Sequence, residues 1–534
     1  MLLKACLCLL PLGLAPTQLK AQQSAPHENP VVLYKGLGTW HHTIHTTSAE
    51  AQEFFDQGLA LTYGFNRYEA LRSFRRAAEL DPQAAMAYWG IAMAQGPYVN
   101  MDGDAELNMK ASCAAVDAGL KLTGTPEREV AWLQAAAKRC PAYRPQVYID
   151  AMRDLANHWP DDLDAQTFYA ESLLIPVRWH WYKADGTAAP GVAEAEHTLE
   201  EVLRRWPDHP GANHLYIHAV ESSPSPERAI ASAQRLMGIM PWAGHMVHMP
   251  GHIWLVLGDY EMAAAVNERA VTVDREYLAE SKTSSGYGMY YLHNMHFIAY
   301  ARWMQGRKAD GLLAAIELAK AVAPMLATMP HMADTFNAVV IFGQVRFQDW
   351  DGILNLPQPK DSLHASLATW HYARALAFRG RGDRTAAAGE QAAFEAIRAA
   401  FPASTGWGLN KAKGVLEIAS ETLAARLAST PAEAVPHWQR AVTGQDGLSY
   451  DEPPDWYYPV RESLGAALLL AGKAAEAESV FREGVKRSPR NGRMLFGLME
   501  SLRVQGKNQD AELVKREFDA AWAKADVTLK VDEL

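Results

Sequence analysis

Residues 51–84 read AQEFFDQGLALTYGFNRYEALRSFRRAAELDPQA, and this stretch decides the fold. Apolar side chains return every three or four residues on both sides of a short turn, which predicts two amphipathic helices. Gly58 lies in the middle of the first helix and Ala70 in the second, so the two backbones can approach closely. Pro82 closes the second helix, because proline lacks the N–H that a helix needs. The stretch therefore predicts a helical hairpin.

The same template returns near the other end of the chain, over residues 458–491. Gly465 is there the small residue of the first helix, Ala477 that of the second, and Pro489 closes the hairpin. Comparable endings recur at Asp81-Pro82, Trp159-Pro160, Trp206-Pro207, Met240-Pro241 and Ser488-Pro489. Almost no segment shows the alternation of a β-strand. We expect an all-α protein of about eight to ten helical hairpins, without a clean domain boundary.

The template resembles the tetratricopeptide (TPR) repeat of about 34 residues. The resemblance covers most of the chain, best over residues 51–95 and 458–520. It implies a TPR-like α-solenoid over residues 49–534, a right-handed superhelix of antiparallel helix pairs, whose groove holds a peptide or protein partner. An enzyme core with scattered helical hairpins is the alternative. The stretch AGHMVHMPGHI (residues 243–253) is also similar to one found in a set of exported bacterial TPR proteins.

Composition and motifs exclude several classes of protein. The chain has 534 residues and a formal net charge of −10, whereas nucleic-acid binding needs clustered Lys and Arg. The sequence contains no serine-hydrolase elbow, phosphate-binding loop, HExxH or haem-attachment motif. No later segment offers about 18 apolar residues in a row. We therefore expect no nucleic-acid partner and no integral membrane segment in the mature chain.

The first 21 residues, MLLKACLCLLPLGLAPTQLKA, resemble a secretory signal peptide. Lys4 precedes an apolar stretch, and small or polar residues follow it. We expect a periplasmic or secreted protein with an N-terminal extension over residues 22–48. Export would leave Cys113 and Cys140 in an oxidising space, where they form a disulfide or remain two separate buried thiols.

Histidines gather in the central repeats, in place of the residues that clamp peptides in ordinary TPR grooves. The turn glycines Gly258 and Gly306 and the second-helix alanine Ala229 set the register, which places the histidines on the groove side of three successive first helices. His245, His248 and His252 lie three and seven residues apart, so at about 100° per residue they share one face. The neighbouring repeats, about 210–305 in all, add His214, His218, Glu221, His293, His296 and Tyr300. Packed helices lie about 8–10 Å apart, so these side chains can meet on one ion.

Seven imidazoles in one groove predict a transition-metal site, since neutral imidazole is the commonest protein ligand for such ions. The set lacks Cys and exceeds the three His that a catalytic zinc ion takes. It suffices for two copper ions with about three His each, or for one ion with a His-lined approach. Copper is favoured, with zinc or iron as alternatives, and the expected chemistry is redox or hydrolytic on a small-molecule substrate. A substrate-binding His cluster, a pH-sensitive groove, a peptide- or protein-binding scaffold and a non-catalytic metal carrier are the other interpretations.

A second group of histidines precedes the repeats. His42 and His45 lie three residues apart, which is a ligand spacing on a helix. They belong either to an arm that folds into the groove and completes the metal site or to a polar N-terminal extension.

The loop over residues 448–461 holds three carboxylates among aromatic residues and prolines. Glu452 is a candidate acid or base, and Arg461 a candidate for holding an anionic substrate. A rigid turn between repeats is the alternative interpretation. The candidate catalytic residues are Glu221, Tyr300 and Glu452.

Overall fold

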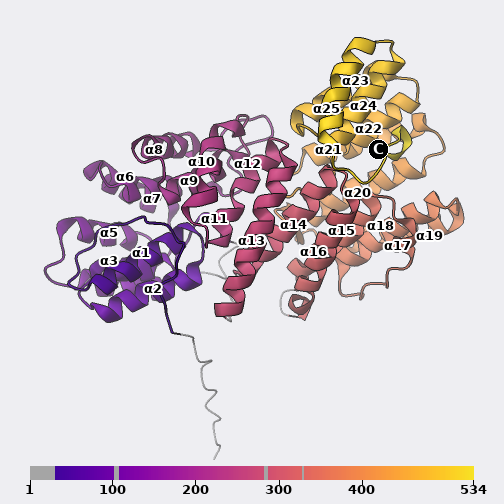
Figure 1. Cartoon of the computed structure of the whole chain (residues 1–534). Helices are drawn as coiled ribbons and strands as arrows, with labels where there is room; N and C mark the ends of the chain where they lie inside the picture. Colours follow the sequence, from indigo (N-terminus) through magenta and orange to yellow (C-terminus); the bar gives the residue numbers. More distant parts are fainter. Residues whose placement is uncertain (1–29, 102–107, 282–286, 328–329) are drawn as a thin grey trace, which may run out of the picture. The chain divides into compact units, whose positions relative to one another are not determined.

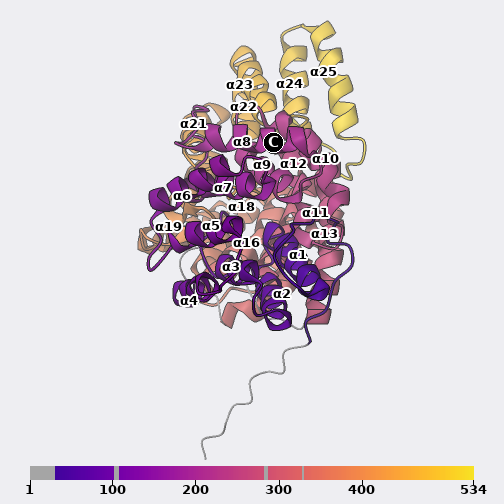
Figure 2. The ribbon, with the colours of Figure 1, turned by 90° about the vertical axis from the view of Figure 1, so that its left-hand side faces the viewer.

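The computed structural model of the chain describes residues 30–101, 108–281, 287–327 and 330–534. The expected signal peptide and the first part of the predicted extension lie outside these ranges. Residues Leu33–Leu534 form one compact unit, in which each helix packs against the next one along the chain (Figure 1). Figure 2 shows the same succession from the side, with the last two helices lying next to each other.

The helices of the first half have the following bounds. They are α1 (Ala49–Tyr63), α2 (Arg67–Leu80), α3 (Ala85–Met93), α4 (Met109–Leu120), α5 (Glu127–Ala137), α6 (Pro145–His158), α7 (Leu163–Leu174), α8 (Val192–Arg205), α9 (Pro210–Glu221), α10 (Ile230–Ile239), α11 (Gly244–His248), α12 (Pro250–Val256) and α13 (Tyr260–Ser281). Short 3-10 turns follow α7 (Ile175–Val177) and precede α10 (Pro226–Ala229).

The second half continues the pattern with one short β-hairpin. Its elements are α14 (Gly288–Met304), α15 (Lys308–Val322), α16 (Pro330–Arg346), α17 (Trp350–Leu354), α18 (His364–Gly380), α19 (Arg384–Ala400), β1 (Gly406–Trp407), β2 (Asn410–Lys411), α20 (Ala412–Leu427), α21 (Pro431–Asp446), α22 (Arg461–Leu470), α23 (Ala474–Arg487), α24 (Gly492–Val504) and α25 (Asn508–Ala521). The 3-10 turns are Ala323–Ala327 and Val531–Glu533.

A glycine–phenylalanine–glycine contact joins successive hairpins. The ring of Phe74 on α2 lies between Gly58 on α1 and Gly90 on α3, and a Cβ on these glycines would approach the ring to 2.6 and 2.3 Å. No side chain fits at such distances, so glycine is required where the helices meet. The same contact, with the same spacing of 16 residues, returns in α22–α24 with Gly465, Phe481 and Gly497. This repeated packing makes the fold an all-α, TPR-like α-solenoid, as the sequence predicts.

The predicted turn glycines end the first helices of their hairpins. Gly258 (φ +74°) separates α12 from α13, and Gly306 (φ +71°) separates α14 from α15. These left-handed values favour glycine, which has no Cβ to clash with the backbone. Gly311 stands where a TPR repeat usually has alanine, because a Cβ there would lie 2.4 Å from the ring of Trp303.

The central first helix is interrupted at one residue. The stretch expected to form a single helix divides into α11 and α12 at Met249, since Pro250 cannot donate a backbone hydrogen bond. Met249 keeps α-helical angles (φ −51°, ψ −37°), so the two pieces continue in the same direction. The three histidines of this stretch therefore keep a common face.

Other features bear on the predictions made from the sequence. Cys113 and Cys140 form a disulfide, which decides between the two alternatives. Residues 30–48 precede α1 without regular secondary structure. Among the described residues, no helix combines the length and the apolar character needed to cross a membrane.

Candidate metal centre

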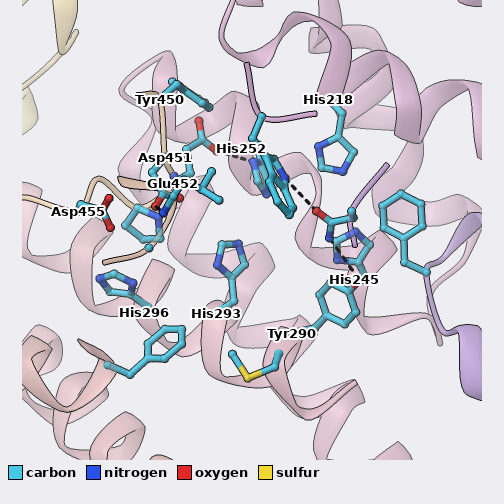
Figure 3. Close-up of a pocket in the computed structure, with 18 of the residues that line it drawn as sticks. His218, His245, His252, Tyr290, His293, His296, Tyr450, Asp451, Glu452 and Asp455 are labelled. Carbon is cyan, nitrogen blue, oxygen red and sulfur yellow. Dashed lines mark hydrogen bonds and ion pairs between the residues drawn. The ribbon is translucent and has the colours of Figure 1, made fainter. Parts of the chain in front are cut away.

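Helices from three hairpins bring six of the predicted histidines into two clusters. α9 packs against α12, and α11 against α14. Within each cluster, one nitrogen of every ring lies within 4.8 Å of the others. We call His214, His218 and His245 the first histidine group, and His248, His252 and His293 the second histidine group. Figure 3 shows His218 and His245 of the first group and His252 and His293 of the second.

The first histidine group is buried and its rings are oriented by hydrogen bonds. His214 Nδ1 lies 2.5 Å from the backbone carbonyl oxygen of Tyr63. A carbonyl only accepts, so Nδ1 carries the proton and Nε2 keeps its lone pair. His218 Nδ1 lies 3.2 Å from Glu221 Oε1, and His218 Nε2 has no hydrogen-bond partner among the described residues. His245 Nε2 approaches His214 Nε2 to 3.1 Å.

The second histidine group has the same design with different anchors. His248 Nδ1 lies 2.7 Å from Asn267 Oδ1, and Asn267 Nδ2 donates to the Ala263 carbonyl at 2.7 Å, which fixes the amide. Gly251 leaves room for this amide, because a Cβ there would lie 2.6 Å from Asn267 Nδ2. His252 Nδ1 lies 2.8 Å from Glu221 and 2.5 Å from Glu452, so its Nε2 points away from both carboxylates and toward His248.

The Nε2 atoms of His248 and His252 are only 2.8 Å apart. His248 Nδ1 donates to Asn267, and His252 Nδ1 lies against two carboxylates, which cannot donate to it. The two Nε2 lone pairs would therefore face each other and repel, unless a proton or a metal ion lies between them. Without metal, the proton is on His252. Burial lowers the pKa of that imidazole, but the carboxylates of Glu221 and Glu452 outweigh burial and raise the pKa to about 10.

Four of the other imidazoles are held neutral. Burial and neighbouring imidazoles lower the pKa of His214, His245, His248 and His293 well below its usual range. Neutral imidazole is the form that binds a metal ion. Burial raises the pKa of Glu221, but His252 and His218 reverse this and lower it to about 2, so this carboxylate stays ionised.

Both groups line one cavity of about 860 Å³. Two imidazoles of each group line it, His218 and His245 of the first and His252 and His293 of the second, while the third lies behind them. In Figure 3, Asp451, Glu452 and Asp455 gather on one side of the pocket and His218 and His245 on the other. The remaining walls are largely aromatic, with Phe65, Tyr98, Trp179, Tyr290, Phe336 and Trp407 among them.

Hydrogen bonds from the β1–β2 hairpin hold the carboxylate side. The Leu409 N–H donates to Asp451 at 3.0 Å, and Asn410 Nδ2 donates to Asp455 at 2.8 Å. Burial and the neighbouring Asp451 raise the pKa of Asp455 to about 9, so the two carboxyl groups share a proton. Burial also raises the pKa of Glu452 to about 7.

Two predicted residues of α14 lie apart from the groups. His296 lines the cavity but places no nitrogen within either group, and its ring packs edge-on against Phe336 at 6.0 Å. Tyr300 does not line this cavity; it lies in a smaller pocket with Trp456 and Tyr458. Burial raises the pKa of its hydroxyl.

The tyrosine beside the histidines is Tyr290, whose ring centroid lies 4.4 Å from that of His245. Its position three residues before His293 puts it on the same helix face, a signal that the sequence contains. Phe65, which packs against His245 at 5.1 Å, and the anchors Tyr63 and Asn267 carry no comparable signal.

The N-terminal histidines lie elsewhere. His42 Nδ1 lies 2.7 Å from Asp164 on α7, in a separate cluster with Asp162. The Asp164 carboxylate also accepts from Trp40 and from the Tyr63 hydroxyl. The backbone N–H of His45 donates to Glu129 at 2.5 Å. The structure therefore does not bring His42 or His45 to the two histidine groups.

Of the two residues predicted to act in the loop before α22, one lies at the histidine groups and the other does not. Glu452 lies beside the second histidine group, as described above. Arg461 is not available to an anionic substrate, because its guanidinium forms two 2.6 Å hydrogen bonds with Asp446.

Sequence comparison relates only a small part of the chain to another protein. No protein-family model matches. An uncharacterized protein of Aquifex aeolicus (strain VF5) is 36% identical over 72 residues, which is 13% of this chain and 10% of the relative. The match thus spans about a tenth of the relative's length.

Several solved structures share a low level of similarity. The APC/C Cut9–Hcn1 hetero-tetramer is 12% identical, over 89% of this chain and 74% of the other, with a TM-score of 0.28. The human IFIT1 dimer is 11% identical, over 90% of this chain and 91% of the other, with a TM-score of 0.30. Yeast Tom70 is 10% identical, over 90% of this chain and 92% of the other, with a TM-score of 0.27. These scores are too low to relate this chain's function to theirs.

Proposed function

We propose that the protein is an exported, metal-binding helical-repeat protein whose central cavity holds two transition-metal ions. The ligands are the Nε2 atoms of the first and second histidine groups, three to each ion. This proposal goes beyond what the fold alone suggests, which is a scaffold for interactions with other proteins.

The observation that carries the proposal is the opposed arrangement of ring nitrogens. In the two groups, hydrogen bonds at Nδ1 of His214, His218 and His248 leave the Nε2 lone pairs of these three rings facing the other imidazoles of their group. Packing alone gives no reason for this, because buried acceptors that face each other are costly. Ligand nitrogens about 2.0–2.1 Å from one tetrahedral ion lie about 3.3 Å apart. The observed 3.1 and 2.8 Å separations need to open by only a few tenths of an ångström.

The ligand set favours copper. Three neutral imidazoles per ion, without cysteine, suit copper or zinc better than the oxygen-seeking ions. Two adjacent copper ions would suit redox chemistry, because each could gain or lose one electron. A hydrolytic zinc centre is the alternative, since zinc with three His ligands keeps an open position for water.

The cavity supplies room for a small-molecule substrate beside both groups. Glu452 lies 2.5 Å from His252 and lines the cavity, so it is positioned to exchange a proton with a bound molecule. Glu221 contacts one histidine of each group and is therefore a positioning residue that orients both rings.

Export is supported by two features. The Cys113–Cys140 disulfide is typical of proteins that mature outside the cytosol. The stretch Ala243–Ile253 resembles that of exported bacterial TPR proteins, and it supplies three of the six proposed ligands.

Metal analysis of protein purified from an exported preparation tests the proposal. Samples dialysed after supplementation with copper, zinc or iron should retain two ions per chain with the physiological metal. Absorption and electron paramagnetic resonance spectra distinguish Cu(II) from zinc. Retention of under half an ion per chain after every supplementation would end the proposal.

A matched pair of variants controls this experiment. The double substitution His245→Ala and His248→Ala removes one ligand from each group and should abolish retention. The double substitution His158→Ala and His197→Ala changes two exposed histidines outside the cavity and should not.

A scaffold that binds a peptide or protein partner is the second candidate, favoured by the TPR-like fold itself. A partner captured equally well by the chelator-treated protein and by the His245→Ala, His248→Ala variant would support the scaffold. Metal storage or delivery without catalysis is a variant of the first proposal. Transfer of the ion to an acceptor, without turnover of any substrate, would identify it.

A further inference from the structure

Carboxylates outnumber cationic side chains along the cavity. Arg67 is the one Lys or Arg among the described residues that line it. Its guanidinium is already engaged, because it donates to the Gly96 carbonyl at 2.7 Å and lies 4.4 Å from the ring centroid of Tyr98. The lining carboxylates are Glu221, Asp451, Glu452 and Asp455. The protein thus provides no Lys or Arg for the carboxylate side of the cavity.

One carboxylate oxygen of Glu452 has no partner in the described part of the chain, although His252 lies against the other. The residue is only 7% exposed, and its Oε1 has no hydrogen-bond partner among the described residues. His252 contacts the other oxygen, Oε2. A buried carboxylate oxygen without a donor is costly, so the position calls for a bound group that donates hydrogen bonds.

Aromatic rings stand next to these carboxylates. Phe342 stacks on Tyr457 with centroids 4.5 Å apart, and Trp407 lies 6.2 Å from Phe342. Gly408 follows Trp407 directly, and a Cβ on it would lie 2.0 Å from an Asp455 oxygen and 2.4 Å from an Asp451 oxygen. Carboxylates flanked by aromatic faces are the arrangement that recognises organic cations, through charge and cation–π attraction.

We propose that this carboxylate side binds the ammonium group of an organic amine, whose apolar body lies along the aromatic walls toward His293. The proposal rests on the proposed function in taking the same cavity as the working site, and it names the class of molecule that enters. A cavity of about 860 Å³ accommodates a small organic molecule.

The first test uses the unaltered protein with two molecules of nearly the same shape. 2-Phenylethylamine is a cation at neutral pH, and 2-phenylethanol is its neutral counterpart. Calorimetry, supported by the fluorescence of tryptophans lining the cavity, measures both dissociation constants. The amine should bind roughly tenfold or more tightly, as expected for a charge-assisted hydrogen bond. Equal affinities would overturn the proposal.

The second test uses variants of the two carboxylates that hold no proposed metal ligand. Asp451→Asn with Asp455→Asn should bring the affinity for the amine down to that for the alcohol and leave the alcohol unchanged. Asp361→Asn, an exposed carboxylate away from the cavity, is the matched control. Circular dichroism checks the fold. A double variant that folds and still prefers the amine would contradict the proposal.

Running each titration with chelator-treated and metal-loaded protein separates this inference from the proposed function. Preference for the amine without any metal retention would remove only the metal proposal. Metal retention without preference for the amine would remove only this one.

Discussion

The two histidine groups are built alike but differ in the charge around them. The first is anchored by the neutral carbonyl of Tyr63 and by one oxygen of Glu221. The second is anchored by the amide of Asn267 and by two carboxylates, the other oxygen of Glu221 and Glu452. Negative charge close to ligands favours a divalent cation. We therefore expect the second group to bind its ion more tightly, and the comparison shows how one cavity can hold two unequal ions.

Removal of one ligand from each group is the strongest way to test that comparison. His245→Ala should abolish the ion of the first group and leave that of the second, and His248→Ala should do the reverse, because two imidazoles remain where three are needed. Elemental analysis of the dialysed variants measures the retained ions. Loss of both ions in either single variant would mean that the six histidines form one site.

The buried carboxylate of Asp164 should matter next, through stability. Asp164→Asn leaves His42 and His209 without their charged partner, and breaking a buried pair costs about 3–5 kcal/mol. The variant should also weaken only the first ion, since the Tyr63 hydroxyl binds Asp164 while the Tyr63 carbonyl orients His214. Denaturant unfolding and metal titration measure the two effects.

The contact between Asp164 and His42 also predicts that the folding stability depends on pH. Burial raises the pKa of Asp164, but its hydrogen bonds with His209 and His42 reverse this and hold the pKa well below its usual range. The contribution of Asp164 to folding stability is therefore present above about pH 3.9 and is lost as pH falls toward the folded pKa. Burial lowers the pKa of His42, but Asp164 outweighs burial and raises it, so that contribution is complete below about pH 6.5 and is lost at higher pH. The difference in folding stability between wild type and Asp164→Asn should therefore be largest between about pH 3.9 and about pH 6.5. A difference that is constant from pH 3 to pH 9 would contradict the assignment.

Asn267→Ala should have a moderate effect confined to the second group. It removes the acceptor that orients His248, and such outer partners are worth about 10–100-fold in metal affinity. Competition with a chelator measures both ions separately. Glu221→Gln is the informative contrast, because it should weaken both ions. An equal loss at both groups in Asn267→Ala would show that the groups are not separately anchored.

His296→Ala should have the smallest effect. Its ring lines the cavity, but no nitrogen of it lies in either group, so metal retention should stay at the wild-type value. Loss of an ion in this variant would require a seventh ligand and a rearranged centre.

The sequence predicts the helical hairpins and the faces of the histidines, because both follow from local spacing. It does not predict which rings meet. His245 and His248 lie on one face of one stretch, yet His245 joins α9 and His248 joins α14. The stagger between neighbouring helices decides this partition, and it depends on packing between residues far apart in the chain.

The predictions that the structure does not support fail for the same reason, which is that contacts between distant helices cannot be read from local spacing. Tyr300 shares a face with His293 but lies two helical turns further on, where it lines a smaller pocket instead of the cavity, and periodicity does not reveal this division. Asn267 and Tyr63 act through single hydrogen bonds from other helices. His42 has a ligand spacing with His45, but Asp164 on α7 supplies a stronger partner for its Nδ1.

The glycines against Phe74 and Phe481 have a consequence for ancestry. Their lack of a side chain is enforced by sterics alone, so descendants of this chain should retain them whether or not they handle metal. The histidines would be free to drift once an ancestral activity disappeared. Relatives that keep these glycines but lack the histidines would therefore be proteins that retain the fold and have lost the metal chemistry.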